Sequence, residues 1–333
     1  MERPKSGFSQ RETERLMRYF EHDVNSASRV LGLDNALPVT VSYTGQREDQ
    51  SSFALPERTS IGIVKKGVVL GDRGGYSLDV NSDFVGEIPW ESPLIRDVHT
   101  VFTLEGFERP RAPFGIGQGD LSRVEHGTEF FGLPIKFPGT EYRVPNELEC
   151  ISAILELCAS FEGRVNPHVN EYYTYLSLYR TYISTGERQL TAGLHSDGVQ
   201  GRRIEPKLPI EHGYAVTDSY PTHFFPQAFD MTGIDVNVHL LDAVFESQVD
   251  RDNVVTNEPG TVIFFDAYCV HQAVPAADSG WRAFLKVMYT PRQYDRLGNA
   301  VNQLFTKDYD REGWEFQPRP IPQDLTLPDS LPQ

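Results

Sequence analysis

Apolar residues in the first half of the chain recur at helical intervals in two places. From Ser9 to about Leu31 they return every three or four residues, which predicts a helix with one buried face. Val144 to Phe161 shows the same interval, and Pro145 near its start is typical of the first turn of a helix. Between these two helices the sequence predicts short strands and turns, followed by a loop-rich region.

The second half of the chain follows a different pattern, because aromatic and β-branched residues gather in short segments separated by Gly, Pro and Asp. The predicted strands are 172–183, 214–220, 234–245, 261–270 and 282–290. Strand after strand without an intervening helix is typical of an antiparallel sandwich or barrel. The predicted fold class is therefore α+β, mainly β, with the helices flanking the strands on their N-terminal side.

These patterns predict a single domain over residues 1–316. The helical and loop-rich elaboration covers 1–171 and the barrel core covers 172–292. The tail 317–333 holds five prolines without periodicity, so we expect it to be extended. The glycine-rich GIGQG at 115–119 has no strand before it and no Gly-Lys-Ser/Thr after it, and we interpret it as a turn and not as a phosphate loop.

Charge and composition narrow the classes of function. The chain has 47 acidic and 31 basic residues and a net charge of −16, which argues against broad binding to nucleic acid or to anionic membranes. Three cysteines without a CxxC pair indicate neither a disulfide framework nor a thiolate zinc site. With no signal peptide and no apolar run of about 18 residues, we expect a cytoplasmic protein that acts on a small molecule. The oligomeric state is left open.

Three residues in the strand-rich half have the spacing of a metal site. His195 and Asp197 are two residues apart, so in an extended segment both point to one face and can reach one ion. His271 comes from a distant strand. Two imidazoles and one carboxylate on one side of an ion leave three positions open, which is the facial arrangement of non-haem Fe(II) oxygenases. A turn capped by Asp197 is the simpler alternative for the HSDG segment.

Arg282 follows His271 by eleven residues, at the start of a strand that we expect to run antiparallel beside the one ending at His271. A buried guanidinium needs an anion, and its planar fork suits a carboxylate. An ordinary surface ion pair is the alternative for Arg282. The pattern His195-x-Asp197, His271, Arg282 resembles that of the Fe(II)/2-oxoglutarate-dependent dioxygenases, over roughly residues 172–292.

The resemblance implies a fold, a set of cofactors and a reaction. The fold is a double-stranded β-helix, which is a jelly-roll or cupin-like barrel. His195, Asp197 and His271 would bind Fe(II), and Arg282 would bind the distal carboxylate of the cosubstrate 2-oxoglutarate. With O2, the iron and 2-oxoglutarate would oxidise an unactivated carbon of a small metabolite or natural-product intermediate. An acidic substrate is one option. Hydroxylation is the first expectation, and desaturation and ring closure are open.

One position departs from the family pattern. The family often has Ser or Thr two residues after the arginine, and Phe284 stands there in this chain. The hydroxyl partner of the distal carboxylate would then come from Tyr179, Tyr289 or the 214–220 segment. Asn237 alternates with apolar neighbours and is a candidate to hold the other end of the cosubstrate.

Two further assignments have explicit rivals. His239 also lies in an alternating segment and competes with His271 as third ligand, although its position relative to Arg282 is less suitable. Arg202 and Arg203 lie in the segment 198–214, which either closes over the site and contacts an acidic group of the substrate or forms a solvated loop.

Two other classes of function use the same barrel. A cupin-like protein can hold a small ligand without redox chemistry. An isomerase or hydrolase can use the same three ligands with Zn or Mn. Arg282 discriminates between these alternatives, because a dicarboxylate cosubstrate requires the arginine and a hydrolase of this type does not.

Overall fold

The computed structural model describes residues 38–40, 60–62, 69–71, 74–78, 80, 84, 86–189, 193–197, 208–236, 239–295, 298–311 and 314. Within these ranges the protein is mainly β with a few helices, so the predicted α+β, mainly β class is confirmed. The helix predicted from Ser9 to Leu31 and the tail 317–333 lie outside the described residues. The division into an elaboration and a core stays a prediction.

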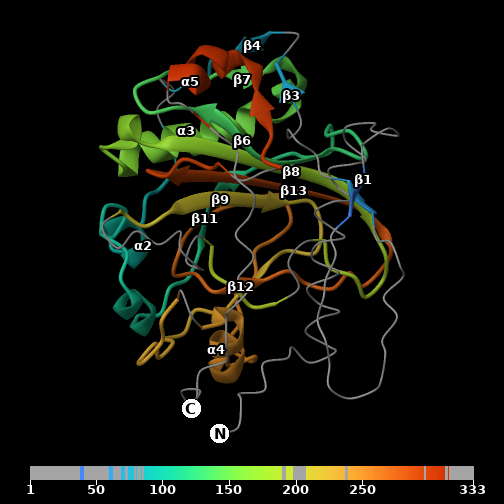
Figure 1. Ribbon diagram of the computed structural model, residues 1–333. Coiled ribbons are helices and arrows are strands. Elements are labelled where there is room, and N and C mark those ends of the chain that lie inside the picture. Colours follow the sequence, from blue (N-terminus) through green and yellow to red (C-terminus); the bar gives the residue numbers. More distant parts are fainter. Residues whose placement is uncertain are drawn as a thin grey trace, which may run out of the picture.

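A six-stranded antiparallel sheet, here called the main sheet, forms the centre of the molecule (Figure 1). Its strands, in spatial order, are β5 (Phe114–Gln118), β11 (Thr261–Asp266), β9 (His212–Thr217), β13 (Gly280–Thr290), β8 (Tyr173–Ile183) and β6 (Glu129–Lys136). The longest pairing joins β13 to β8 over eleven residues. The two outer strands, β5 and β6, come from the part of the chain before residue 172.

A second set of antiparallel pairs, here called the small ladder, lies on one side of the main sheet. In it β10 (His223–Phe224) pairs with β12 (His271–Gln272). Two single bridges extend the ladder, one from His195 to His271 and one from Phe224 to Val255. Figure 1 shows β12 and helix α4 (Leu241–Gln248) below the main sheet and helix α3 (Ser152–Val165) above it.

The remaining described β-strands and α-helices are short and surround these layers. They are β1 (Pro38–Thr40) paired with β2 (Ser60–Gly62), β3 (Val69–Leu70) paired with β14 (Val301–Asn302), β4 (Gly75–Tyr76) paired with β7 (Val144–Pro145), and the helices α2 (Pro93–Arg96) and α5 (Thr306–Arg311). Among the described residues, no helix has the length and apolar content needed to cross a membrane.

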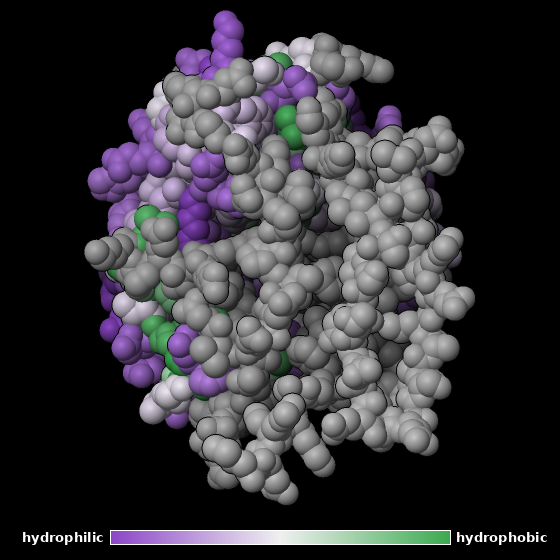
Figure 2. All heavy atoms as spheres, in the orientation of Figure 1, coloured by the Kyte–Doolittle hydropathy of each residue, from purple (hydrophilic) through white to green (hydrophobic). Residues whose placement is uncertain are grey.

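Alternation along β13 assigns the two faces of the main sheet. Leu285, Val287 and Tyr289 join the large core cluster that also contains the apolar face of α3. Arg282 and Lys286 alternate with them and face the small ladder. On the outside, the described residues in Figure 2 are mostly hydrophilic with scattered hydrophobic ones. The buried face of the main sheet that carries Arg282 and Lys286 therefore includes charged groups beside apolar ones.

The predicted strands at 172–183 and 282–290 are confirmed as β8 and β13. The helix predicted from Val144 begins later than expected, because a 3₁₀ turn over Asn146–Ile151 precedes α3. The strand predicted at 261–270 ends at Asp266, and a turn separates it from β12.

Two predictions for local structure are wrong. The segment 234–245 was expected to be a strand, but it leads into α4, where Leu241, Val244 and Phe245 bury one helical face. The GIGQG segment was expected to be a turn, but it lies mostly within β5. Glycine serves packing there, since a Cβ added at Gly117 would lie 2.8 Å from Leu157 Cδ2 on α3.

Candidate metal centre

The two candidate histidines lie side by side in the small ladder. His195 N donates to His271 O at 3.0 Å, and His271 N donates to His195 O at 2.9 Å. Residues that exchange both backbone hydrogen bonds face each other directly and direct their side chains to the same face. The centroids of the two imidazole rings are accordingly 4.3 Å apart. One bridge of the small ladder thus brings together two side chains that are distant in the sequence.

Both imidazoles are oriented by a backbone carbonyl two residues earlier. His195 Nδ1 lies 2.9 Å from Gly193 O, and His271 Nδ1 lies 2.8 Å from Cys269 O. Because a carbonyl oxygen only accepts, Nδ1 donates in each ring, and Nε2 of the neutral imidazole keeps its lone pair. Metal-binding histidines are commonly fixed by such a bond from the other ring nitrogen.

Asp197 completes the group. One ligand atom from each of His195, Asp197 and His271 lies within 4.8 Å of the other two, which is the one such group of His, Cys, Asp or Glu in the described part of the chain. His271 Nε2 and Asp197 Oδ2 are 3.9 Å apart, so they share no hydrogen bond. Atoms at this separation can both bind one ion at about 2.1 Å.

The local charges suit this role. Burial by itself raises the pKa of Asp197, but the Lys286 ammonium, 3.0 Å from Oδ2, and the two imidazoles outweigh burial and hold that pKa well below its usual range. Burial and the neighbouring His195 lower the pKa of His271 to about 4. At neutral pH the site offers an ionised carboxylate and an uncharged His271, so its donor set fits Fe(II) or another divalent ion.

The turn before His271 is fixed from several sides. Asp266 Oδ1 accepts Tyr268 N at 2.9 Å, and Asp266 Oδ2 accepts a terminal nitrogen of Arg111 at 2.8 Å. The Arg111 guanidinium also lies 4.7 Å from the centroid of the Tyr268 ring. Ser196 donates its hydroxyl to a carbonyl of the same turn, so its side chain is directed away from the metal group. These contacts leave the His271 backbone little freedom.

Arg282 is buried, with 4% of its surface exposed. Its Nε donates to Ser219 O at 2.8 Å, one terminal nitrogen donates to Tyr220 O at 2.9 Å, and the other donates to Gln189 Oε1. These acceptors are neutral, and no carboxylate of the described residues lies within ion-pair distance of the guanidinium. Burial lowers the pKa of Arg282 to about 10 despite the opposing effect of Asp218, so the group is charged at neutral pH. A buried cation of this kind is suited to an anionic ligand.

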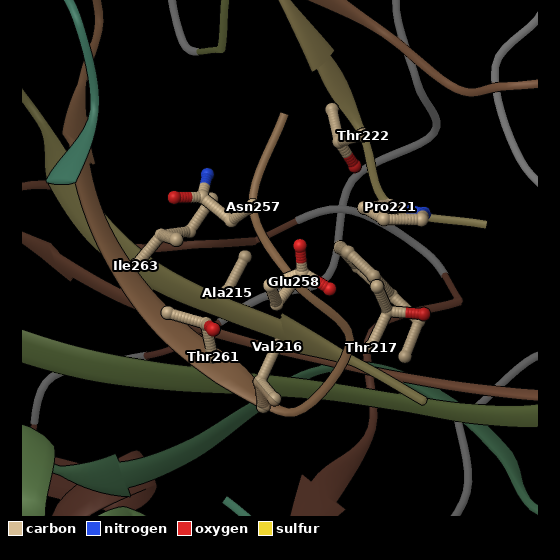
Figure 3. Close-up of a pocket in the computed structure, with 10 residues that line it drawn as sticks. Ala215, Val216, Thr217, Pro221, Thr222, Asn257, Glu258, Thr261 and Ile263 are labelled. Atoms are coloured by element: carbon tan, nitrogen blue, oxygen red, sulfur yellow. The ribbon is translucent and has the colours of Figure 1, made fainter. Parts of the chain in front are cut away.

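A small pocket lies between β9, β11 and the segments around Pro221 and Asn257 (Figure 3). Its wall includes Phe284, whose ring centroid is 5.4 Å from Arg282 Cζ. Thr217 faces Phe284 across the β9–β13 pairing and brings a hydroxyl to the same wall. Asn257 Nδ2 is buried there without a hydrogen-bond partner. The pocket and Arg282 are thus connected through Phe284, which lines the pocket and contacts the guanidinium.

The other predicted site residues have different outcomes. His239 is not part of the metal group, and its Nδ1 accepts Asp235 N at 3.0 Å. Tyr289, one candidate for the missing hydroxyl, lies on the opposite face of the main sheet, and its hydroxyl is 3.1 Å from that of Tyr142. Tyr179 pairs with Phe284 across β8 and β13. Tyr179 and Thr217 therefore remain the candidates.

Several predicted residues are not described. Asn237, Arg202 and Arg203 lie outside the described residues, as does most of the segment 198–214. The expected pairing of the His271 strand with the Arg282 strand is wrong. β12 pairs with β10 in the small ladder, whereas β13 pairs with β8 and β9 in the main sheet. The chain crosses between layers after β12, which the apolar pattern alone does not reveal.

Sequence reasoning missed two residues of the site, Lys286 and Gln189. Lys286 could have been found, because it stands four positions after Arg282 in a predicted strand and must share its face. Gln189 left no comparable signal. It precedes His195 in a turn region, and only the fold brings its amide to Arg282.

Comparison with known proteins gives partial likenesses only. No family model and no curated protein matches the chain. EvdO2 from Micromonospora carbonacea var. aurantiaca is 19% identical, with a TM-score of 0.24, over 36% of this chain and 51% of its own, so the chain spans about half the length of EvdO2. AviO1 from Streptomyces viridochromogenes is 14% identical, with a TM-score of 0.30, over 56% and 92%. ThoJ, described as a non-heme monooxygenase, is 12% identical, with a TM-score of 0.23, over 42% and 60%.

Proposed function

We propose that the protein is an Fe(II)/2-oxoglutarate-dependent dioxygenase that oxidises a small molecule. The observation that carries the proposal is the pairing of His195 with His271, which together with Asp197 places one ligand atom of each residue within 4.8 Å of the other two. The buried Arg282 guanidinium, bound only to neutral acceptors in the described structure, supplies a second and independent feature. A metal ion would account for the group of His195, Asp197 and His271, and a bound carboxylate would account for the buried Arg282.

The order of strands supports a double-stranded β-helix. Along the chain, segments that belong to the main sheet alternate with segments of the small ladder. The sequence is β8, the bridge at His195, β9, β10 with the bridge at Val255, β11, β12 and β13. Alternation between two facing antiparallel layers is the connectivity of a jelly roll. Both metal-binding histidines would then project from the smaller layer, and Arg282 from the larger one.

In this proposal each residue has a defined task. His195, Asp197 and His271 hold Fe(II), which supplies the activation of O2 coupled to oxidation of 2-oxoglutarate to succinate. The Arg282 fork binds the distal carboxylate, and Gln189 and two backbone carbonyls hold the fork in place. Thr217 or Tyr179 replaces the hydroxyl that Phe284 lacks. The substrate is a small metabolite or natural-product intermediate, and hydroxylation is the reaction that we expect first.

An anaerobic titration tests the proposal. Purified full-length protein receives Fe(II) and then 2-oxoglutarate, and the visible spectrum is followed for the weak charge-transfer band of a chelated keto acid. We expect the band with the native chain and its loss in Asp197→Ala. Succinate formation is then measured across a panel of metabolites to find the substrate. Fe(II) binding without the band, together with no succinate in air, would contradict 2-oxoglutarate dependence and favour a Zn or Mn isomerase or hydrolase.

One observation favours a second candidate. The Lys286 ammonium lies against Asp197, so the carboxylate already has a cationic partner in this structure. A non-redox, cupin-like binding protein could retain this ion pair in place of a metal. Absence of any bound divalent ion at equilibrium with Fe(II), Zn(II) or Mn(II) would support that candidate.

A further inference from the structure

Lys286 stands directly beside the proposed metal group. It lies four residues after Arg282 on the same face of β13, so one strand presents two cations to the interior. Lys286 Nζ donates to Asp197 Oδ2 at 3.0 Å, and this same oxygen is 3.9 Å from His271 Nε2. The ammonium is therefore held against the carboxylate oxygen that faces the histidine.

The strands on either side leave room for this contact. Lys286 pairs with Ser177 on β8 and with Ala215 on β9, which both have short side chains. The Lys286 side chain keeps 21% of its surface exposed and that of Asp197 keeps 17%, so the pair is only partly screened by water. Asp197 is the one carboxylate within ion-pair distance of Lys286 in the described structure.

We infer that Lys286 sets the charge of the metal centre and thereby selects anionic ligands for the ion. The inference rests on the proposed function. Two neutral imidazoles and one carboxylate leave a divalent ion with a net charge of +1, whereas the adjacent ammonium raises the total to +2. The ammonium repels the metal ion and attracts an anion that is bound to the metal, because the metal and the anion both lie within a few ångströms of Lys286. The ligand class selected is the carboxylate of an α-keto acid.

Two possible roles of Lys286 predict opposite changes in metal affinity when the residue is replaced. If its charge matters, removing the charge strengthens metal binding and weakens binding of an anion to the metal-loaded protein. If Lys286 only orients Asp197, its removal weakens metal binding, because hydrogen bonds to ligands usually support them. Opposite changes in the two affinities are therefore the signature of the charge.

The experiment uses the full-length chain with Co(II), which reports on its surroundings through its visible spectrum. Competition with a chelating dye gives the affinity for Co(II), and titration of the loaded protein with azide and with 2-oxoglutarate gives the affinity for anions. The variants are Lys286→Met, Lys286→Gln, which keeps a hydrogen-bond donor, and Lys286→Arg, which keeps the charge. Lys307→Met, at an exposed lysine on α5, is the matched control for loss of one positive charge.

In Lys286→Met and Lys286→Gln we expect Co(II) to bind about tenfold more tightly and azide to bind about tenfold more weakly. Lys286→Arg and Lys307→Met should resemble the native chain. Weakening of both affinities, or no change in either, would overturn the inference while leaving the metal centre intact. No Co(II) binding by the native chain or by any variant would instead overturn the proposed metal centre, and the inference with it.

Discussion

Two buried clusters on opposite faces of the main sheet both combine histidine with a carboxylate, but they differ in which atoms are already used. In the α3 cluster, defined as Glu162, Asn166, His212 and Tyr214, His212 Nε2 lies 2.7 and 2.9 Å from the two oxygens of Glu162. Tyr214 and Asn166 donate to the same carboxylate at 2.8 and 2.6 Å. In the metal group, by contrast, His271 Nε2 and Asp197 Oδ2 are 3.9 Å apart and share no hydrogen bond.

The difference shows what distinguishes a structural His–carboxylate pair from a candidate set of metal ligands. In the α3 cluster the imidazole nitrogen that could bind a metal donates to Glu162, and three donors already occupy the carboxylate. In the metal group the Nδ1 atoms of His195 and His271 donate to backbone carbonyls, and the lowered pKa of His271 leaves its Nε2 without a proton, 3.9 Å from Asp197 Oδ2. Residue types alone therefore do not define a metal site, whereas the partner of Nδ1 is informative.

The largest effect that would sharpen this comparison is the loss of a ligand. In His271→Ala we expect at least ~1000-fold weaker Fe(II) binding, because loss of an outer hydrogen-bond partner alone costs ~10- to 100-fold. Thermal unfolding should change little. Metal content after equilibrium dialysis is the measurement, with His239→Ala as the matched control. Retained binding in His271→Ala and loss in His239→Ala would transfer the role to His239.

The second largest effect concerns the α3 cluster, where we expect a substitution to lower the free energy of unfolding. Glu162→Gln keeps the shape of the side chain but removes the charge that His212 and Tyr214 contact, at a site with no exposed surface. Breaking a buried pair on one side costs about 3 to 5 kcal/mol. We expect the free energy of unfolding in urea to fall by about that amount, with Fe(II) affinity per folded molecule unchanged. A parallel loss of metal binding would show that the two faces are coupled.

The sequence was informative about the metal group because its signals are local or periodic. The two-residue spacing of His195 and Asp197, and the apolar strands around His271 and Arg282, can be read directly from the order of residues. The α3 cluster could not be found in this way. It joins a helix to a strand through side chains whose neighbours are set only when α3 packs on the main sheet.

The errors in the fold have a similar origin. Apolar residues in 234–245 suit a buried strand or a short buried helix equally well, and tertiary packing decided for α4. The sequence does not predict β5, because glycine is unfavourable in strands, but Gly117 lies close to Leu157 on α3 and Gly115 lies close to Thr261 on β11. Assignment of β12 and β13 to different layers depends on the whole topology and therefore has no local signal.

A smaller effect is expected from replacing Arg282, the buried cation on the same face of the main sheet as the metal group. In Arg282→Lys the charge remains, but the fork that meets a carboxylate at two points is lost. We expect KM for 2-oxoglutarate to rise roughly tenfold, which corresponds to about 1.4 kcal/mol, while Fe(II) affinity stays the same. Steady-state succinate production at saturating substrate is the measurement. An unchanged KM in both Arg282→Lys and Arg282→Ala would contradict the role of this residue.

The smallest effect is the dependence of stability on pH that the α3 cluster should confer. Burial alone lowers the pKa of His212, but the Glu162 carboxylate and its hydrogen bonds outweigh burial and raise it above the ordinary value near 6.5. The stabilising contribution of the charged pair is therefore complete below about pH 6.5 and is lost as pH rises through the folded pKa. Between those values the slope approaches about −1.4 kcal/mol per pH unit.

The window from about pH 6.5 to 8 is where this contribution of His212 is measured. Burial lowers the pKa values of His99, His223 and His271, so their effects on stability fall mainly below pH 6.5. Burial also lowers the pKa of Lys136 to about 8, so its effect, which has the opposite sign, begins in the upper part of this window. Urea unfolding at several pH values should show falling stability in the native chain and a flatter profile in Glu162→Gln. The same slope in both chains would show that His212 is uncharged in the folded state. The contact between His212 and Glu162 would then be a hydrogen bond and not an ion pair.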